Sequence, residues 1–361
     1  MKPDKTLLEN FAPQLLKWNS EENCRQMPWK GQKDPYKIWL SEIILQQTRV
    51  EQGLKYYTKF LEAFPDVHTL AHAPEHSVYK LWEGLGYYTR CRNLIKSAHY
   101  ISKERNGRFP ENYDEILKLN GVGPYTASAI ASFAYNHSHA VVDGNVFRVL
   151  ARIFGIKISI DSSEGKTFFS RLANKLLDKK LPGLYNQAIM DFGAVICKPV
   201  PLCNGCIFRK HCYAYRHNKI SLLPVKQTKA NLKKRWFYYL ILEYKDFIAV
   251  RQRSGKDIWH NLFEYYPVEK PAVNNYLSIL KQAEIDGILE KNSYNMISVS
   301  KTYNQKLSHQ VITGRFIHVK LNQKLKLNGG LEWHSKSKLQ NLAFPKFINQ
   351  YRVEITGIKL V

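Results

Sequence analysis

The sequence lacks any long run of apolar residues. No window approaches the roughly 18 consecutive apolar residues of a membrane-spanning helix, so none is expected. The N-terminal stretch MKPDKTLLEN also lacks the apolar segment of a secretory signal peptide. We therefore expect a chain that works in the cytoplasm.

Acidic residues are scarce relative to basic ones. The chain has 30 Asp and Glu against 54 Lys and Arg, a net charge of +24, and its pI is near 9.6. A folded chain this basic usually meets a polyanion, either nucleic acid or an anionic membrane surface. A lysine-rich proteome would give the same charge without such a partner. We favour nucleic acid and expect no membrane association.

Cysteine is also sparse, with six residues in 361, and four of the six crowd into one short stretch. Few cysteines in an intracellular chain argue against a disulfide framework. Thiolates at these spacings can surround one metal centre, either structural zinc or a [4Fe–4S] cluster, and the spacing does not choose between the two. The candidate ligands are Cys197, Cys203, Cys206 and Cys212.

The length suits two domains that each bury a core. Residues 1–215 read as mostly helical and include the cysteine loop at 197–212. Residues 216–232 are polar, basic and marked by proline, which is typical of a linker. The β-type runs WFYYLILEY, FIAVRQR, ISVS and VITGRFIHVKL then predict an α+β domain over 233–361.

A bare turn precedes one of the predicted helices. In LNGVGPYTASAI, Gly121 and Gly123 allow positive φ and carry no Cβ, and Pro124 suits the first turn of the helix. The exposed N–H groups would form an anion site that fits a backbone phosphate. A plain tight turn between two helices is the alternative, and the net charge favours the phosphate.

Several long motifs together resemble a known family. LNGVGPYTA, VVDGNVFRVLAR and the cysteine loop resemble the helix-hairpin-helix DNA glycosylases that carry an iron–sulfur cluster. PYKIWLSEIILQQT, LWEGLGYYTRCRNL and YNQAIMDFGAVIC narrow the resemblance to adenine DNA glycosylases of the MutY type, densely over about residues 10–215. The C-terminal part is similar to that family's Nudix-like domain more loosely. It has no Nudix catalytic box, so pyrophosphatase activity is not implied.

The resemblance implies a partner and a reaction. The partner would be duplex DNA with adenine opposite 8-oxoguanine or guanine, bound by a monomer at the bacterial nucleoid. The enzyme would flip the adenine out and excise it, and the four cysteines would hold a [4Fe–4S] cluster, with zinc as the alternative.

Two carboxyl groups are the candidate catalysts. Glu42 lies on a helix that is apolar nearly all round, and burial raises a carboxyl pKa and makes it a general acid. A core glutamate paired with Arg or Lys is the alternative. Asp143 has the chemistry of a helix N-cap. The resemblance implies that Glu42 protonates the adenine, that Asp143 stabilises the positive charge on the sugar, and that Asn145 orients the pair.

Tyr125 predicts that the enzyme does not form an imine with the sugar. Related bifunctional glycosylases carry a lysine here, whose amine forms an imine with the sugar. Tyrosine cannot form that imine. We therefore expect a monofunctional glycosylase that leaves an abasic site.

The resemblance also implies DNA-contacting residues. The adenine pocket would comprise Trp29, Lys30, Leu45 and Gln187. Gln47 and Tyr87 would wedge into the base stack with Thr48 beside the damaged base, and Ser308 and His309 would read 8-oxoguanine. The plain alternatives are helix surface for Gln47, core packing for Tyr87 and a polar turn between strands for Ser308.

Four positions depart from the family pattern. The first cysteine gap is five residues where six is usual, and Asn120 stands where proline is usual. Lys30 stands where arginine is commoner, and Leu307 replaces an aromatic residue.

Two other functions stay open: a mismatch thymine or uracil glycosylase of the same superfamily, and a non-catalytic DNA-binding protein with a structural metal loop. His68, His72 and His76 recur every four residues, but Pro74 interrupts the run, so we expect no continuous helix and no metal site there.

Overall fold

The computed structural model describes residues 5–227, 232–255 and 257–356. The chain forms two compact units, Met1–His72 with Asn93–Lys229, and Ala73–Arg92 with Ala230–Val361. The sequence placed residues 73–92 in the helical domain. In the structure they pack with the C-terminal sheet, because side chains of that segment are hydrogen-bonded to it.

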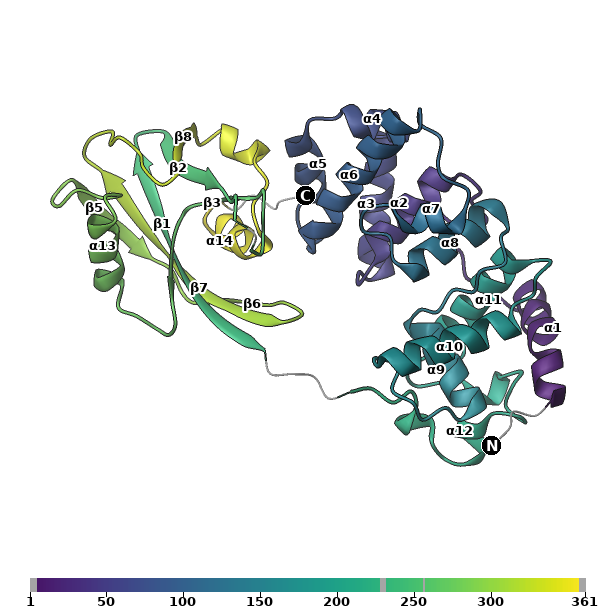
Figure 1. The fold of residues 1–361 in the computed structure, drawn as a ribbon. Coiled ribbons are helices and arrows are strands. Elements are labelled where there is room, and N and C mark those ends of the chain that lie inside the picture. The colour runs from purple at the N-terminus through teal and green to yellow at the C-terminus, as the bar shows by residue number, and fades with distance from the viewer. Residues whose placement is uncertain (1–4, 228–231, 256, 357–361) are drawn as a thin grey trace. The chain divides into compact units, whose positions relative to one another are not determined.

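The first unit is helical (Figure 1). Asp34 caps the second helix by accepting a hydrogen bond from the Tyr36 N–H at 2.9 Å, and Pro35 is its first residue, as the sequence predicted. The helices are α1 (Lys5–Glu21), α2 (Pro35–Leu45), α3 (Val50–Ala63), α4 (Val67–His72), α6 (Tyr88–Glu104, which begins in the other unit), α7 (Tyr113–Leu117), α8 (Pro124–Tyr135), α9 (Gly144–Phe154), α10 (Ser163–Leu176), α11 (Pro182–Val195) and α12 (Tyr213–Arg216), with 3-10 turns at Cys203–Gly205 and Ile220–Leu222.

In the core of the helical unit, the N-terminal helix packs against the cysteine loop. Phe11 of α1 stacks on Phe208 of that loop with ring centroids 4.6 Å apart, and Phe208 meets Phe192 of α11 edge-on at 5.4 Å. All three rings are fully buried. Aromatic burial of this size dominates core energetics, so the loop is held by packing on its inner side.

Part of the expected linker belongs to the helical unit. Leu223 is buried in the helical core, and its carbonyl accepts a hydrogen bond from Arg152 Nε at 3.0 Å. The Ile160 N–H donates to the Val225 carbonyl at 3.1 Å. The chain therefore stays attached at least through Val225, and the linker expected over 216–232 begins later than the composition indicated.

The second unit is a mixed sheet with helices. The strand order is β3-β2-β1-β7-β5; β1 and β7 run parallel, and every other pair is antiparallel. Its elements are α5 (Glu75–Trp82), β1 (Lys233–Tyr244), β2 (Phe247–Gln252), β3 (Phe263–Glu264), β4 (Tyr266–Lys270), α13 (Tyr276–Ile285), β5 (Tyr294–Val299), β6 (Tyr303–Lys306), β7 (Gln310–Leu321), β8 (Glu332–Ser335), a 3-10 turn (Lys338–Asn341) and α14 (Lys346–Thr356).

The long central strand is buried on both faces. Tyr238, Leu240 and Leu242 belong to a core with Ile279 of α13. The alternate residue Tyr239 instead faces the aromatic rings of α14, with a centroid distance of 6.2 Å to Phe347. Side chains alternate along a strand, so helices pack against both faces of this sheet.

The α+β character of the second unit is confirmed, and its expected likeness to Nudix domains stays a prediction. Within the described residues, every helix is too short or too polar to cross a bilayer.

Candidate active site

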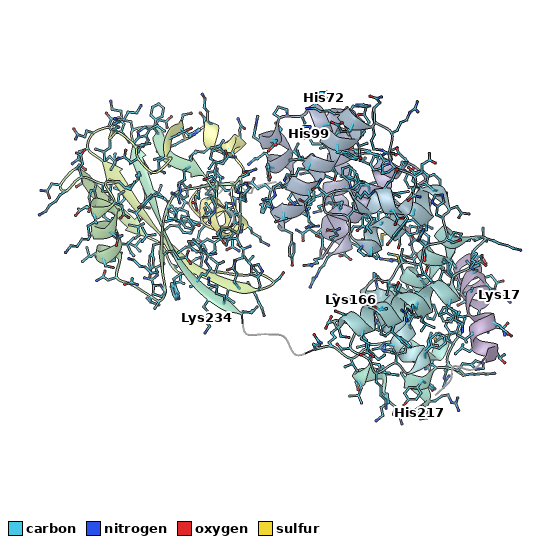
Figure 2. All side chains as sticks on the ribbon, in the orientation of Figure 1. Lys17, His72, His99, Lys166, His217 and Lys234 are labelled. Carbon is cyan, nitrogen blue, oxygen red and sulfur yellow. The ribbon has the colours of Figure 1, made fainter. Side chains whose placement is uncertain are left out.

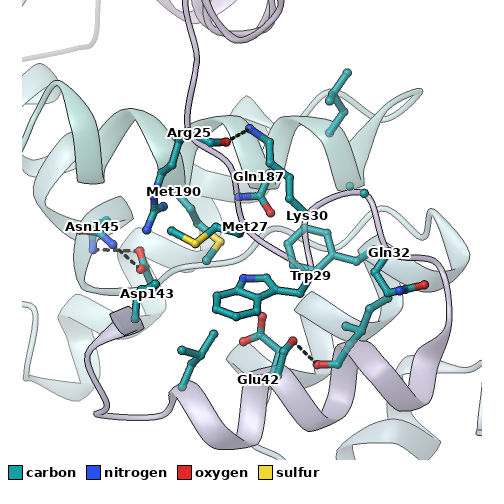
Figure 3. A pocket seen from close by; sticks show the side chains of 18 of the residues that line it. Arg25, Met27, Trp29, Lys30, Gln32, Glu42, Asp143, Asn145, Gln187 and Met190 are labelled. Atoms are coloured by element: carbon teal, nitrogen blue, oxygen red, sulfur yellow. Dashed lines mark hydrogen bonds between the residues drawn. The ribbon is translucent and has the colours of Figure 1, made fainter. Parts of the chain in front are cut away.

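One pocket of about 490 Å³ in the helical unit gathers all the predicted catalytic and adenine-pocket residues (Figure 3). A cavity of this size accommodates a single flat heterocycle. Of the predicted residues it is lined by Glu42, Tyr125, Asp143, Asn145, Trp29, Lys30, Leu45, Gln187 and Thr48.

Glu42 is a buried acid in the floor of this pocket. It comes from the middle of α2, and only 7% of it is exposed. Burial raises its pKa to about 7; the Tyr125 hydroxyl opposes this by donating a hydrogen bond, and the negative charge of Asp143 adds to it. In the described part of the chain no Arg or Lys contributes to the pKa of Glu42. A substantial fraction of this carboxyl is therefore still protonated near neutral pH, as a general acid must be.

Asp143 is the N-cap of α9, as its sequence context predicted, and it also lines the pocket. Its Oδ1 caps α9 by accepting from the N–H groups of Asn145 at 2.8 Å and Val146 at 2.7 Å. Asn145 Nδ2 donates to Oδ2 at 2.8 Å, which fixes the plane of the carboxylate. Burial raises the pKa of Asp143 above its ordinary value, and these hydrogen bonds and the charge of Arg148 offset only part of that rise. Three donors and a helix N-terminus favour a fixed anion in the pocket wall.

Asn145 is itself held by Arg148. Arg148 Nη2 donates to Asn145 Oδ1 at 2.8 Å and to the Gly193 carbonyl at 2.7 Å, and its Nε donates to the Cys197 carbonyl at 2.7 Å. A Cβ on Gly193 would lie 2.7 Å from Asn145 Cβ, so only glycine allows α11 to approach α9 this closely. One guanidinium thus joins the cysteine loop to the residue that orients Asp143.

Asp191, a fully buried carboxylate of α11, was not predicted from the sequence. Its Oδ1 accepts from Arg25 Nη1 at 2.7 Å and Gln187 Nε2 at 3.0 Å, and its Oδ2 pairs with Lys30 Nζ at 3.0 Å and accepts from Asn23 Nδ2 at 2.9 Å. Three of these partners line the pocket: Arg25, Lys30 and Gln187. The missed signal was a single acid in the apolar run QAIMDFGAV, the same pattern that singled out Glu42.

The four clustered cysteines line one small pocket whose other walls are largely apolar. None of the six cysteines is paired in a disulfide in the structure. Burial raises the pKa of the Cys206 thiol to about 12 and also raises the pKa of Cys197 and Cys212. Among the described residues, no group of three or more His, Cys, Asp or Glu is arranged to hold a metal ion.

The two glycines of the bare turn differ. Gly121 has a φ of +78° and lies tightly against Asn93, whereas Gly123, the N-cap of α8, has a φ of −97° and extended backbone. The expectation that both use positive φ holds only for Gly121. A Cβ on Gly123 would meet no atom within 4 Å, so the helix mouth is open.

The other predicted DNA contacts lie outside the pocket. Gln47 is exposed just after α2, with a φ of +55°. Tyr87 is 46% exposed, so its reading as core packing is wrong. Ser308 and His309 are exposed in the turn between β6 and β7, and Tyr87 Oη lies 2.9 Å from Ser308 Oγ within the second unit.

Two further expectations concern the surface. The histidine run is broken as predicted, because α4 ends at His72 and α5 begins at Glu75. Lysines such as Lys17, Lys166 and Lys234 are exposed and project from the ribbon (Figure 2), as a chain with this net charge requires.

Comparisons with known proteins agree with this geometry. The model of the HhH-GPD superfamily of base excision DNA repair proteins matches residues 40–175. An adenine DNA glycosylase of Buchnera aphidicola subsp. Baizongia pistaciae is 34% identical over 97% of this chain and 97% of its own. The mouse adenine DNA glycosylase is 38% identical over 59% of this chain and 44% of its own.

Among solved structures, a thermostable thymine-DNA glycosylase aligns with a TM-score of 0.54 and 30% identity, covering 58% of this chain and 97% of its own. Endonuclease III in a non-covalent DNA complex aligns with a TM-score of 0.51 and 21% identity, covering 60% of this chain and 98% of its own, which shows a shared fold.

Proposed function

The chain belongs to the adenine DNA glycosylases, and from that premise we propose that it excises adenine opposite 8-oxoguanine or guanine in duplex DNA. Excision breaks the bond between the adenine and its deoxyribose, and water replaces the base on the sugar. The target base must leave the stack to enter a pocket of this kind, which costs a few kcal/mol. The observation that carries the proposal is the buried Glu42 carboxyl, with its pKa near 7, in the same pocket as Asp143.

In the proposed mechanism the two carboxyl groups have opposite roles. Glu42 gives its proton to a ring nitrogen of the adenine, so the base leaves as a neutral molecule. Asp143, held by Asn145 and by the start of α9, stabilises the positive charge that develops on the sugar. Two carboxyls in one pocket with different roles follow the general logic of glycoside cleavage.

The proposed substrate is tested with four duplexes carrying A:8-oxoguanine, A:G, T:G and U:G. Alkaline cleavage of the product reveals each abasic site. We expect strand breaks with the two adenine duplexes. Breaks confined to T:G or U:G would contradict the proposal and favour a mismatch thymine or uracil glycosylase. The thymine-DNA glycosylase structure motivates that comparison, but it covers 58% of this chain against 97% for the adenine relative.

Tyr125 supports a monofunctional reaction. Its hydroxyl hydrogen-bonds Glu42, and its pKa is raised by burial and by the two carboxyls, so it stays protonated and is no nucleophile. Borohydride should therefore not trap the protein on DNA. Efficient covalent trapping would contradict this assignment.

The proposed cofactor is a [4Fe–4S] cluster on Cys197, Cys203, Cys206 and Cys212. Four thiols around one largely apolar pocket fit such a donor set. The bound cluster would take up the thiolates and cross-link the loop. Equal amounts of iron and acid-labile sulfide, with a visible absorption band, would support this cofactor, whereas stoichiometric zinc would replace it.

The exposed lysines and the open helix mouth after Gly121 support duplex DNA as the partner. We further propose that the enzyme works as a monomer at the bacterial nucleoid, in the cytoplasm. Sedimentation with and without DNA tests the monomer.

A further inference from the structure

Side-chain hydrogen bonds join residues 73–92 to the C-terminal sheet unit. Lys80 Nζ donates to the Leu342 carbonyl at 3.3 Å, and Asn261 Nδ2 donates to the Tyr79 hydroxyl at 3.3 Å. Tyr79 is 3% exposed. The helix α5 therefore behaves as part of the sheet unit, although the chain reaches it long before the first strand.

Glu83 is the centre of this attachment. Its Oε1 accepts from the Phe344 N–H at 2.7 Å and from Asn349 Nδ2 at 2.8 Å, and its Oε2 accepts from Lys80 Nζ at 2.6 Å. The Glu83 side chain is only 9% exposed. Arg352 Nη1 donates to Asn349 Oδ1 at 3.1 Å, which fixes the amide that faces Glu83. A buried carboxylate with both oxygens occupied sets a unique geometry, because losing a partner leaves a desolvated charge.

The chain after Glu83 is a rigid loop that ends at Tyr87. Trp82 Nε1 donates to the Gly86 carbonyl at 2.9 Å, and the Arg90 guanidinium lies 5.3 Å from the Tyr87 ring centroid. Tyr87 is exposed at a φ of +49°, a backbone conformation that a tyrosine rarely adopts. Such a conformation persists where neighbouring structure imposes it. Its hydroxyl meets Ser308 Oγ at 2.9 Å.

We propose that Glu83 is a positioning residue for lesion recognition: it fixes the end of α5 to residues 344–349 and thereby holds Tyr87 beside Ser308. The inference rests on the proposed function, in which Tyr87 and Ser308 contact the DNA at 8-oxoguanine. Glu83 touches no DNA. It determines how strongly adenine opposite 8-oxoguanine is preferred over adenine opposite guanine.

The test compares the full-length wild type with Glu83→Ala, Asn349→Ala and the control Glu75→Gln, an exposed glutamate of the same helix. Single-turnover excision and the KM are measured for A:8-oxoguanine and A:G duplexes. In Glu83→Ala the preference for 8-oxoguanine should fall several-fold, about as much as in Ser308→Ala and mainly through KM, with a smaller fall in Asn349→Ala. Glu83→Gln keeps one acceptor for Phe344 and Asn349 and should recover part of the preference, and Glu75→Gln should match the wild type.

A double variant separates positioning from general damage to the fold. Adding Glu83→Ala to Ser308→Ala should cost little further preference, because both changes break one unit. An unchanged preference in Glu83→Ala, or an equal loss on both duplexes, would overturn the inference.

A wild type without any preference for 8-oxoguanine would instead contradict the proposed function. Hydrogen exchange on the DNA-free proteins then decides the inference by itself. Protection of residues 84–87 must fall in Glu83→Ala and stay unchanged in Glu75→Gln, and equal protection in both would overturn it.

Discussion

The two units hold their proposed functional residues in different ways. In the helical unit, two carboxyl groups at or behind the pocket are fixed by several partners: Asp143 by three donors, and Asp191 by four. In the sheet unit, Ser308 is exposed on a turn, and its contact with Tyr87 is one hydrogen bond. Chemistry requires preorganised charge, whereas a recognition loop must still adapt to DNA. Mutations in the first region should therefore cost far more than mutations in the second.

The largest effect should come from Glu42→Gln. Without the proton donor, excision should fall by about 10² to 10⁴-fold while binding to A:8-oxoguanine duplex persists. Single-turnover excision and a binding titration measure the two quantities. Glu62→Gln, an exposed change on α3, is the matched control. Undiminished excision by Glu42→Gln would remove the acid from the mechanism.

The next largest effect should come from Asp191→Leu. The change leaves Arg25 and Lys30 without their shared carboxylate, and breaking a buried pair this way costs about 3–5 kcal/mol of unfolding free energy. Denaturant unfolding measures the loss. Because Gln187 is also released, KM for the adenine duplex should rise in the surviving fold. A stability within about 0.5 kcal/mol of the wild type, the range of ordinary surface changes, would show that the network is dispensable.

A moderate effect should follow from pH. Glu42 has its pKa raised to about 7, so its proton is present below that value and lost above it. Single-turnover excision should fall about tenfold per pH unit above pH 7. The same shift destabilises the fold progressively as pH rises from 4.5 to about 7, and the loss is complete above that, so Glu42→Gln should be more stable than the wild type at pH 8. A rate that increases above pH 7 contradicts the assignment.

The smallest effect should come from Ser308→Ala. One exposed hydrogen bond is worth about 0.5–1.5 kcal/mol, so excision opposite 8-oxoguanine should fall only several-fold. Excision opposite guanine should fall less, because guanine lacks the 8-oxo modification that the Ser308 hydroxyl is proposed to recognise. Ser254→Ala, an exposed change on another loop of the same unit, is the control. A loss comparable to that of Glu42→Gln would erase the contrast between the two regions.

Much of the fold could be predicted from short-range sequence features. Asp34 and Pro35 located the start of α2, and the long apolar runs located β1 and β7, because capping and burial act within a few residues. The short strands β3, β4, β6 and β8 were missed, since pairing rather than composition defines strands of two to five residues.

Some residues of the site were predicted from the sequence and others were not, again because long-range contacts leave no local pattern. The resemblance supplied Glu42, Asp143 and the other pocket residues, and the structure gathers nine of them. It supplied neither Asp191 nor Glu83, because their partners are distant in sequence: Asn23 is 168 positions from Asp191, and Asn349 is 266 from Glu83. Only tertiary contacts reveal such residues.

The attachment of residues 73–92 to the sheet has a consequence for protein engineering. The chain passes between the units at 72–73, 92–93 and 229–230, so no single cut separates them. A fragment ending at 229 would retain Glu83 but lose the Phe344 and Asn349 groups that satisfy it. Grafting the C-terminal unit onto another glycosylase would require transplanting α5 and its loop as well. In this sense the functional module is discontinuous, and its border follows hydrogen bonds rather than chain order.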